Sequence, residues 1–591
     1  MILDRIDWLI IAAFFLVSMG IGLYAARSAG KNTKEFFLSG RNMPWWLLGI
    51  SMVATTFSAD TPTLVADIVR KNGVSGNWAW WAFLLTGMLT VFVYARLWRR
   101  SGVATDLEFY EIRYGGKSAA FLRGFRAIYL GVFFNIMIMA TVSLAAIKIG
   151  AVMLNLSPVE TVVIASSVTV IYSSLGGLRG VLLTDFFQFF IAMAGSIGAA
   201  WYVLDMPEIG SLSALVAQPA VSAKLSLLPD FSDSKTLIPL LVIPLAVQWW
   251  SVWYPGAEPG GGGYIAQRML SAKNEKNALG ATLFFNIAHY ALRPWPWIII
   301  ALASLVLFPN IESLQAAYPN LPADKVNDDL AYPAMLTFLP TGLLGLVIAS
   351  LVAAYMSTIS THLNWGSSYV VNDFYQRFVK PSASDKELVL VGRLSTVIMM
   401  AVSAVIALLL ENQLQSFNLL LKIGAGTGLV FIMRWFWWRI NAYTEITGMV
   451  VSFLLAIYFE LLHRQVFGFE AIPDHVTLVL SVGITTAAWL IVTLLTQPER
   501  QEVLASFYQK VKPAAWGWQK VIDKDKSLVA SKSQLGFEIG MMFVACFMVY
   551  GALFATGYWI YGNLSAAIPS TIVALLGAAY LLKNWKKIKF L

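Results

Sequence analysis

Apolar runs of about 20 residues recur from one end of this 591-residue chain to the other. Each run is long enough to cross the hydrocarbon core of a bilayer as a helix. Charged residues make up 13% of the chain, about half of their share in soluble proteins. A transmembrane barrel would instead show alternating segments of about 10 residues, and the sequence has no such pattern. The sequence therefore predicts an all-α polytopic protein that is embedded in the lipid bilayer.

We expect about fifteen transmembrane helices, whose ends are placed to within a few residues. The predicted spans are 6–26, 44–70, 76–98, 120–153, 159–178, 181–204, 237–255, 279–307, 340–366, 388–410, 414–436, 445–463, 474–496, 537–560 and 565–583.

Lysine and arginine clusters predict the orientation of these spans. They follow the first, third, seventh and thirteenth spans, and they include Arg27, Lys34, Arg99, Arg100, Arg126, Arg268, Lys273, Lys276, Lys510 and Lys520. All of them lie in the cytoplasm if the N-terminus is outside and the C-terminus inside, in a cytoplasmic membrane. The net charge of +9 then follows from this rule, and we expect no nucleic-acid partner.

Two of the predicted spans contain residues that interrupt a helix. Span seven runs into "WYPGAEPGGGGY" (253–264), and span two contains "TFSADTPTL" (56–64). A helix broken at membrane depth survives only where it is buried in protein or lines a watery cavity. The tract at 253–264 can also be a loop just beyond its span. Interrupted helices five spans apart, however, are typical of secondary transporters built from inverted repeats, whose ion and solute sites lie at the breaks.

Five stretches of the chain together resemble the sodium:solute symporter family over roughly 6–440. They are "TKEFFLSGRNMPWW" (33–46), "TDLEFYEIRYG" (105–115), "SSLGGLRGVLLTDFFQ" (173–188), "IAQRMLSAKN" (265–274) and "AAYMSTISTHLNWGSSYVVNDFY" (353–375). The resemblance implies the leucine-transporter-type fold, with two inverted five-helix repeats. We expect these repeats at 44–204 and 237–440, after a first helix and loop (1–43) and before additional helices (441–591).

The resemblance also implies a first sodium site between spans two and nine. Its ligands would be the carbonyl groups of Ala54, Phe57 and Ala354 and the hydroxyl groups of Ser357 and Thr358. The three span-nine residues share one helical face, and a hard cation prefers oxygen ligands. The alternative is that these hydroxyl groups bond the carbonyl groups of their own helix, as is usual in membrane helices.

Some family members have a second sodium site, which here would consist of Asp185, Ser360 and Thr361. The alternative for Asp185 is a carboxylate near the start of span six that complements the helix dipole.

The solute site differs from that of the sugar transporters in the family. Thr61 and Gly262 replace a Gln and an Asn that bind sugar hydroxyl groups there, and tryptophans, Trp80 and Trp81 among them, replace an acidic ligand. The galactose-type pocket is therefore absent, although a sugar can still stack on tryptophan.

Three ionisable residues are candidates to replace it: Asp60, Glu258 and Arg293. A central Arg in lipid costs at least about 2.5–3.5 kcal/mol, so Arg293 needs a partner. We expect Glu258 and Arg293 to face each other beside the solute path, with Asp60 nearby. The alternative is a structural Arg–Glu clamp that binds no solute.

These features predict a sodium-coupled symporter that acts as a monomer. It would import a small polar solute (a sugar, sugar acid, amino acid or carboxylate) by alternating access, with sodium as the bound ion. A membrane-embedded solute sensor and a passive uniporter are the alternatives on the same fold. The sequence shows no nucleophile–base pair or metal constellation, so we expect no enzyme.

Overall fold

The computed structural model describes residues 3–29, 38–103, 105–173, 177–252, 258–319, 321–531 and 534–588. Within these ranges the chain is helical, and its only β-type pairing is an isolated bridge between Met43 and Ala272. Eleven helices of the described residues are long and apolar enough to cross a membrane. The apolar helices Trp45–Thr56, Pro158–Val170 and Ser234–Trp250 are shorter. The all-α polytopic class is thus confirmed, but the count of about fifteen spans is not.

The helices fall into three consecutive sets along the chain. The first contains α1 (Arg5–Ala29), α3 (Trp45–Thr56), α4 (Asp60–Asn72), η2 to α7 (Val74–Ser101), α8 (Glu108–Arg113), α9 (Gly116–Ile128), α10 (Asn135–Leu154), α11 (Pro158–Ser173) and α12 (Gly177–Leu204). The second contains α15 to η6 (Ser234–Trp250), α17 (Gly263–Ser271), α18 (Glu275–Ile287), α19 (Pro294–Leu307), α21 (Ala331–Leu336), α22 (Leu343–Ser368), η10 (Tyr369–Val379), α23 (Asp385–Leu409), α24 (Gln413–Ile423) and α25 (Gly428–Met433). The third contains α26 (Ala442–Ile457), α27 (Asp474–Leu495), α28 (Gln501–Val511), α29 (Gln519–Lys524), α30 (Leu535–Ile560) and α31 (Leu564–Asn584).

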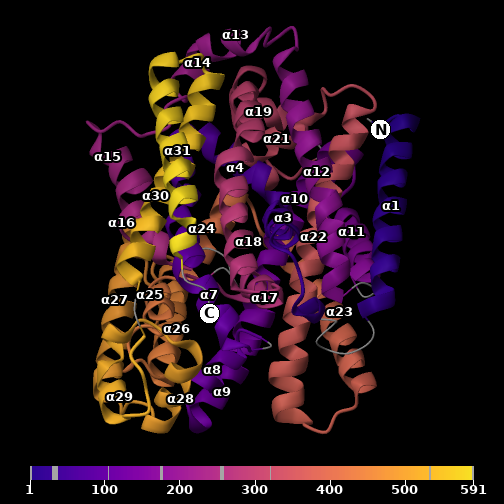
Figure 1. Ribbon diagram of the computed structural model, residues 1–591. Coiled ribbons are helices and arrows are strands. Elements are labelled where there is room, and N and C mark those ends of the chain that lie inside the picture. The colour runs from indigo at the N-terminus through magenta and orange to yellow at the C-terminus, as the bar shows by residue number, and fades with distance from the viewer. Residues whose placement is uncertain are drawn as a thin grey trace.

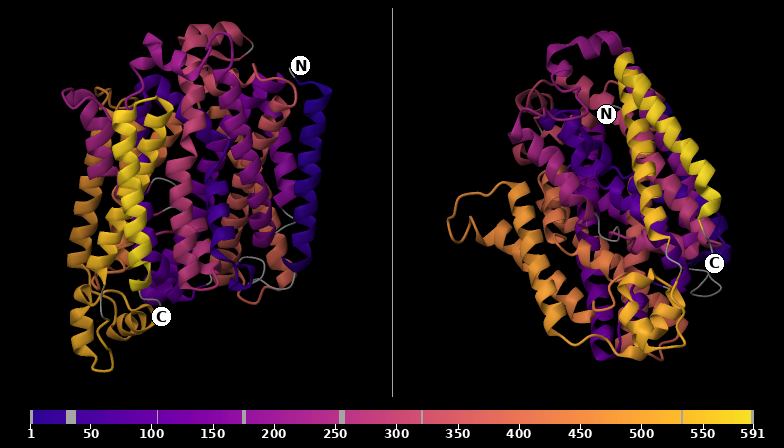
Figure 2. Two further views of the ribbon diagram at one scale, coloured as in Figure 1. Left: turned by 45° about the horizontal axis from the view of Figure 1, so that its top comes forward. Right: turned by 60° about the vertical axis from the view of Figure 1, so that its left-hand side comes forward.

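The long helices stand side by side between two ends of the molecule (Figure 1). The N-terminus lies at one end, and α8, α9, α28 and α29 lie at the other, which we call the basic end (Figures 1 and 2). The basic end carries residues of the predicted cytoplasmic clusters, among them Lys510 and Lys520. Large apolar side chains cover the outer surface, and Leu16, Trp201 and Leu495 are 74%, 76% and 81% exposed. Such a surface suits hydrocarbon and not water.

Two groups of helices pack around the centre. In one group, α3 packs against α18 and α4 against α19. In the other, α10 and α11 pack against α22 and α23. The helix α12 contacts both groups, through α3 and α22. The interface between the two groups therefore lies beside the junction of α3 and α4.

The predicted break in span two is present, since α3 ends at Thr56 and α4 begins at Asp60. In the second predicted break, residues 253–257 lie outside the described residues. Gly260 and Gly261 follow with φ angles of 86° and 88°, a left-handed conformation that favours glycine.

A third break, which we did not predict, separates α24 from α25 at "GAGTG" (424–428). A Cβ atom at Gly428 would lie 1.7 Å from the carbonyl oxygen of Trp250, in η6. Only glycine allows this approach, so the third break packs directly against the segment that leads into the second.

Candidate functional site

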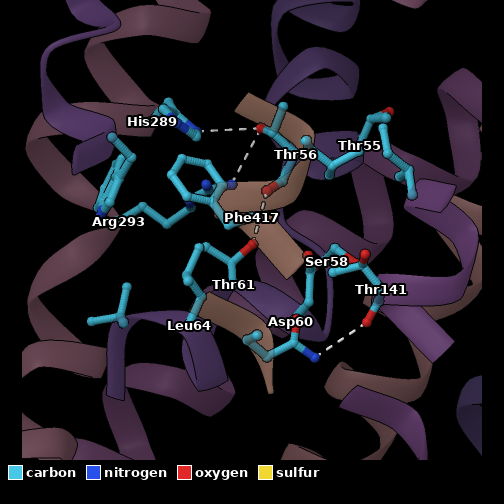
Figure 3. Close-up of a pocket in the computed structure, with 15 residues that line it drawn as sticks. Thr55, Thr56, Ser58, Asp60, Thr61, Leu64, Thr141, His289, Arg293 and Phe417 are labelled. Atoms are coloured by element: carbon cyan, nitrogen blue, oxygen red, sulfur yellow. Dashed lines mark hydrogen bonds between the residues drawn. The ribbon is translucent and has the colours of Figure 1, made fainter. Parts of the chain in front are cut away.

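A buried pocket lies at the break between α3 and α4 (Figure 3). Its walls come from the break itself and from the helices α10, η2 to α7, α18 to α19 and α24. The lining residues are Thr55, Thr56, Ser58, Asp60, Thr61, Leu64, Val65, Trp80, Ile138, Thr141, His289, Arg293, Gln413, Phe417 and Leu420. Hydroxyl groups, one carboxylate, one guanidinium and two large aromatic rings thus meet in one space, which we call the central pocket.

Arg293 is held at the wall of the central pocket by the end of α3. Its Nη1 donates to the carbonyl oxygen of Val53 at 3.1 Å and to Thr56 Oγ1 at 3.3 Å. The guanidinium lies 5.7 Å from the ring centre of Phe57 and 5.1 Å from that of Trp297. Its Nε and Nη2 atoms have no hydrogen-bond partner among the described residues. The side chain is therefore fixed in place with donors to spare for a ligand.

Asp60 is the first residue of α4 and lines the same pocket. Its Oδ1 atom is buried and has no hydrogen-bond partner in the part of the chain that the structure describes. Thr61 Oγ1 donates to the carbonyl oxygen of Thr56 at 3.3 Å, which leaves the lone pairs of the hydroxyl oxygen available. In Figure 3, Arg293 and His289 lie on the left of the pocket and Ser58 and Thr141 on the right.

Trp80 supplies an aromatic wall of the central pocket. Its Nε1 donates to Asn77 Oδ1 at 2.8 Å, and its ring stacks on Tyr290 with centroids 5.8 Å apart. Trp81, which we also predicted here, is fully buried and is not among the residues that line the pocket. Gly262 is likewise absent from the lining and packs against the side chain of Glu258. Asp60, Thr61, Trp80 and Arg293 are thus the predicted residues that meet in this pocket.

The expected pairing of Glu258 with Arg293 is wrong. The carboxylate of Glu258 accepts a hydrogen bond from Arg126 and lies 3.5 Å from Nη2 of Arg434. Arg126 comes from α9, where we counted it among the charges of a cytoplasmic loop, and Arg434 follows α25. Both arginines are buried, at 1% exposure, so the burial of one carboxylate is compensated by two cations. For each of these two arginines, the available sequence signal was a charged residue inside an apolar run.

The proposed first sodium site has hydroxyl groups of α22 facing the end of α3. Thr358 Oγ1 donates to the carbonyl oxygen of Thr55 at 2.9 Å, and not to a carbonyl of its own helix. Ala54, Phe57, Ala354 and Ser357 are each at most 3% exposed. The N–H of Phe57 donates to the carbonyl oxygens of Val53 and Ala54, at 2.8 and 3.1 Å, and closes the last turn of α3.

Asp185 is fully buried against the same part of α22. It accepts hydrogen bonds from Ser357 and, at 2.5 Å, from Ser51 of α3. The Nη2 atom of Arg268 lies 3.9 Å from this carboxylate and donates to Thr361 Oγ1 at 3.4 Å. Asp185 is not in the first turn of α12, which disfavours the helix-dipole alternative.

The third predicted member of the second site, Ser360, donates to the carbonyl oxygen of Ser357 at 3.1 Å, within its own helix. We did not predict that an arginine, Arg268, stands beside this group. Arg268 belongs to the "QR" pair of the "IAQRMLSAKN" stretch, and we had counted it as one of the loop charges of span seven.

Two known cotransporters are similar to this chain over most of its length. The chain is similar to the sodium/glucose cotransporter of Vibrio parahaemolyticus, with 24% identity over 476 residues that cover 78% of this chain and 86% of the relative. It is 27% identical over 548 residues to sodium/myo-inositol cotransporter 2 of Oryctolagus cuniculus, which covers 84% of this chain and 78% of that one.

A solved structure and a family model identify the fold and the family of the chain. The structure of a Na⁺-coupled sialic acid symporter, substrate-bound and outward-open, aligns with a TM-score of 0.66 and 22% identity, covering 84% of this chain and 99% of that one. This likeness shows the leucine-transporter-type fold. A family model described as the sodium:solute symporter family matches residues 36–452. The chain belongs to the sodium:solute symporter family.

Proposed function

We propose that this protein imports a small polar solute together with sodium, by alternating access, as a monomer in the cytoplasmic membrane. In this proposal the N-terminus is outside and the basic end faces the cytoplasm, in accord with the positive-inside rule. The observation that carries the proposal is the bond from Thr358 to the Thr55 carbonyl, beside a pocket with unpaired polar groups. This bond joins a hydroxyl group of the proposed sodium site on α22 to Thr55 of α3, which also lines the pocket.

The proposed first sodium site uses the carbonyl groups of Ala54, Phe57 and Ala354 and the hydroxyl groups of Ser357 and Thr358. The carbonyl end of α3 carries partial negative charge, which favours a cation there. The proposed second site uses Asp185 with Ser360 and Thr361. Because Ser357 donates to Asp185, both sites share one hydroxyl group. Occupation of one site is therefore expected to change the other.

The proposed solute site is the central pocket. The free donors of Arg293 suit a carboxylate or hydroxyl oxygen, and the free acceptor of Asp60 suits a hydroxyl or ammonium group. Trp80 offers a face on which an apolar ring surface can stack. A solute that bears both donors and acceptors fits this lining, and sugars, sugar acids, amino acids and small carboxylates all contain such groups.

Equilibrium binding to the purified protein tests this proposal. Labelled solutes from these four classes are titrated in buffer with sodium or with an equal concentration of choline. If the sodium and solute sites are coupled, each ligand must raise the affinity of the protein for the other by the same factor. We expect one class to bind, with a lower Kd in sodium, and the Kd for sodium to fall equally when that solute is present. Solute binding that is independent of sodium would contradict the proposed coupling.

A further inference from the structure

Glu258 joins parts of the molecule that are far apart in the sequence. Its carboxylate contacts Arg126 of α9 and Arg434 after α25. Arg434 in turn donates to the hydroxyl oxygen of Tyr110 at 2.9 Å, and its Nη1 lies 3.5 Å from Glu445 of α26. These five side chains form a buried cluster, which we call the Glu258 cluster.

The backbone next to Glu258 contains two glycines with left-handed φ angles. These are Gly260 and Gly261, and glycine interconverts between such conformations at little cost. In the present conformation, two hydrogen bonds hold this segment in place. The N–H of Gly261 donates to the Glu258 carbonyl oxygen at 2.7 Å, and Trp98 Nε1 donates to the Gly260 carbonyl oxygen at 2.7 Å.

A second carboxylate, that of Asp106, connects the start of α17 to η10. Asp106 accepts a hydrogen bond from the N–H of Gly263, the first residue of α17, at 2.7 Å. It also accepts a hydrogen bond from the hydroxyl group of Tyr369 in η10. Movement of α17 away from η10 must therefore break at least one of the two contacts of Asp106.

The Glu258 cluster lies between the central pocket and the basic end. Glu258 lines a small cavity together with Thr86, Thr90, Asn286 and Tyr290. Tyr290 stacks on Trp80, which belongs to the central pocket. On its other side the cluster includes Tyr110 of α8, at the basic end of the molecule (Figure 1).

We propose that Glu258 is the residue that holds the cytoplasmic side of the solute pathway closed, by bridging Arg126 and Arg434. This inference rests on the orientation in the proposed function. A buried carboxylate and its arginines are stable only when they are paired with one another or solvated by water. Opening therefore requires that water reaches all three side chains. Without the carboxylate of Glu258, Arg434 keeps only Glu445, and Arg126 keeps no carboxylate contact among the described residues. The two buried cations also repel each other, so the closed state loses stability relative to the open, hydrated state.

The test measures access of water-soluble reagents to the cavity next to Glu258. The chain has one cysteine, the buried Cys546, which is first removed as Cys546→Ala. Thr90→Cys then places a thiol in that cavity, at a side chain that is 6% exposed. The labelling rate with a charged maleimide is measured on purified protein, alone and combined with Glu258→Gln. We expect labelling about tenfold faster with Glu258→Gln, which is the effect of a 1.4 kcal/mol shift.

Glu111→Gln is the matched control. Glu111 also pairs with two arginines, Arg123 of α9 and Arg377 of η10, but Glu111 itself lies in α8 and not beside the glycine-rich segment. It should leave the labelling rate unchanged. If Glu258→Gln does not fold, Glu258→Asp retains the charge but shortens the reach, and it should accelerate labelling to a smaller extent.

Unchanged labelling in the Glu258 variants, or equal acceleration by Glu111→Gln, would overturn the inference. The readout requires no transport, so this outcome is distinct from a failure of the proposed function, which would appear as sodium-independent binding with the labelling difference intact.

Discussion

The hydroxyl group of Ser357 donates a hydrogen bond to the carboxylate of Asp185, which connects α22 to α12. Ser357 is a ligand in the proposed first sodium site, and Asp185 is the acidic ligand of the proposed second site. A hydroxyl group that donates a hydrogen bond to a carboxylate still has the lone pairs of its oxygen available for a cation. In the proposed site, this bond would orient Ser357 for sodium binding.

Removal of either hydroxyl group of the first site should weaken sodium binding. We expect Ser357→Ala and Thr358→Ala to raise the sodium concentration for half-maximal uptake several-fold, and Thr358→Ser to have a small effect because the hydroxyl group persists. Ser350→Ala is the control, since Ser350 lies on the same helix but donates to its own helix, to the Val347 carbonyl oxygen at 2.7 Å. Sodium-dependent uptake is the measurement. Wild-type sodium dependence in both alanine variants would show that the site lies elsewhere.

Asp185→Asn should change the number of sodium ions that move with each solute. One sodium ion moving down a tenfold gradient supplies about 1.4 kcal/mol, and about 2.3 kcal/mol more per 100 mV of membrane potential. For an anionic solute, a second ion is needed to retain the voltage contribution. For such a solute we expect reversal potentials to give about two sodium ions per solute in the wild type and about one in Asp185→Asn. A wild-type ratio of one would eliminate the second site.

Arg293→Lys should reduce solute affinity although the charge is retained. The guanidinium holds Val53 and Thr56 with one nitrogen and leaves two others for the solute. A lysine ammonium is a point charge that cannot do both. We expect the Kd for the solute to rise about tenfold or more, which corresponds to one lost charged hydrogen bond. Binding at the wild-type Kd would assign Arg293 a purely structural role.

Trp80 and Trp81 offer a matched pair of substitutions. Trp80 lines the central pocket, whereas Trp81 is buried beside it and lies outside the lining. Trp80→Phe should weaken solute binding, because stacking area and the bond to Asn77 are lost. Trp81→Phe should leave the Kd unchanged, even if it lowers the melting temperature. Equal effects of the two variants on the Kd would show that the solute does not contact Trp80.

The sequence drew attention to several residues of the candidate sites and of the Glu258 cluster, but it did not predict their partners. Charged residues are rare in apolar helices, so Asp60, Glu258 and Arg293 were conspicuous, and helical spacing placed Ser357 and Thr358 on one face. Pairing depends on how distant helices pack, and Glu258 and Arg126 are 132 residues apart. No local sequence pattern predicts a contact between residues so far apart in the chain. Arg293, in the next predicted span, was therefore a poor choice as the partner of Glu258.

The third break shows a different limit. The "GAGTG" stretch was visible in the sequence, but glycines also occur within membrane helices. The requirement for Gly428 comes from the carbonyl group of Trp250, which belongs to another span. Its role followed only from the packing of the two segments.

Transport driven by an imposed sodium gradient tests the central claim most directly. Proteoliposomes that contain the purified protein are given the solute that binds, at equal concentration inside and outside. A sodium gradient directed inward should then accumulate the solute above the outside concentration, and reversal of that gradient should expel it. Collapse of the gradient should return the two concentrations to equality. Uptake that stops at equal concentrations whatever the sodium gradient would identify a passive uniporter and contradict sodium-coupled symport.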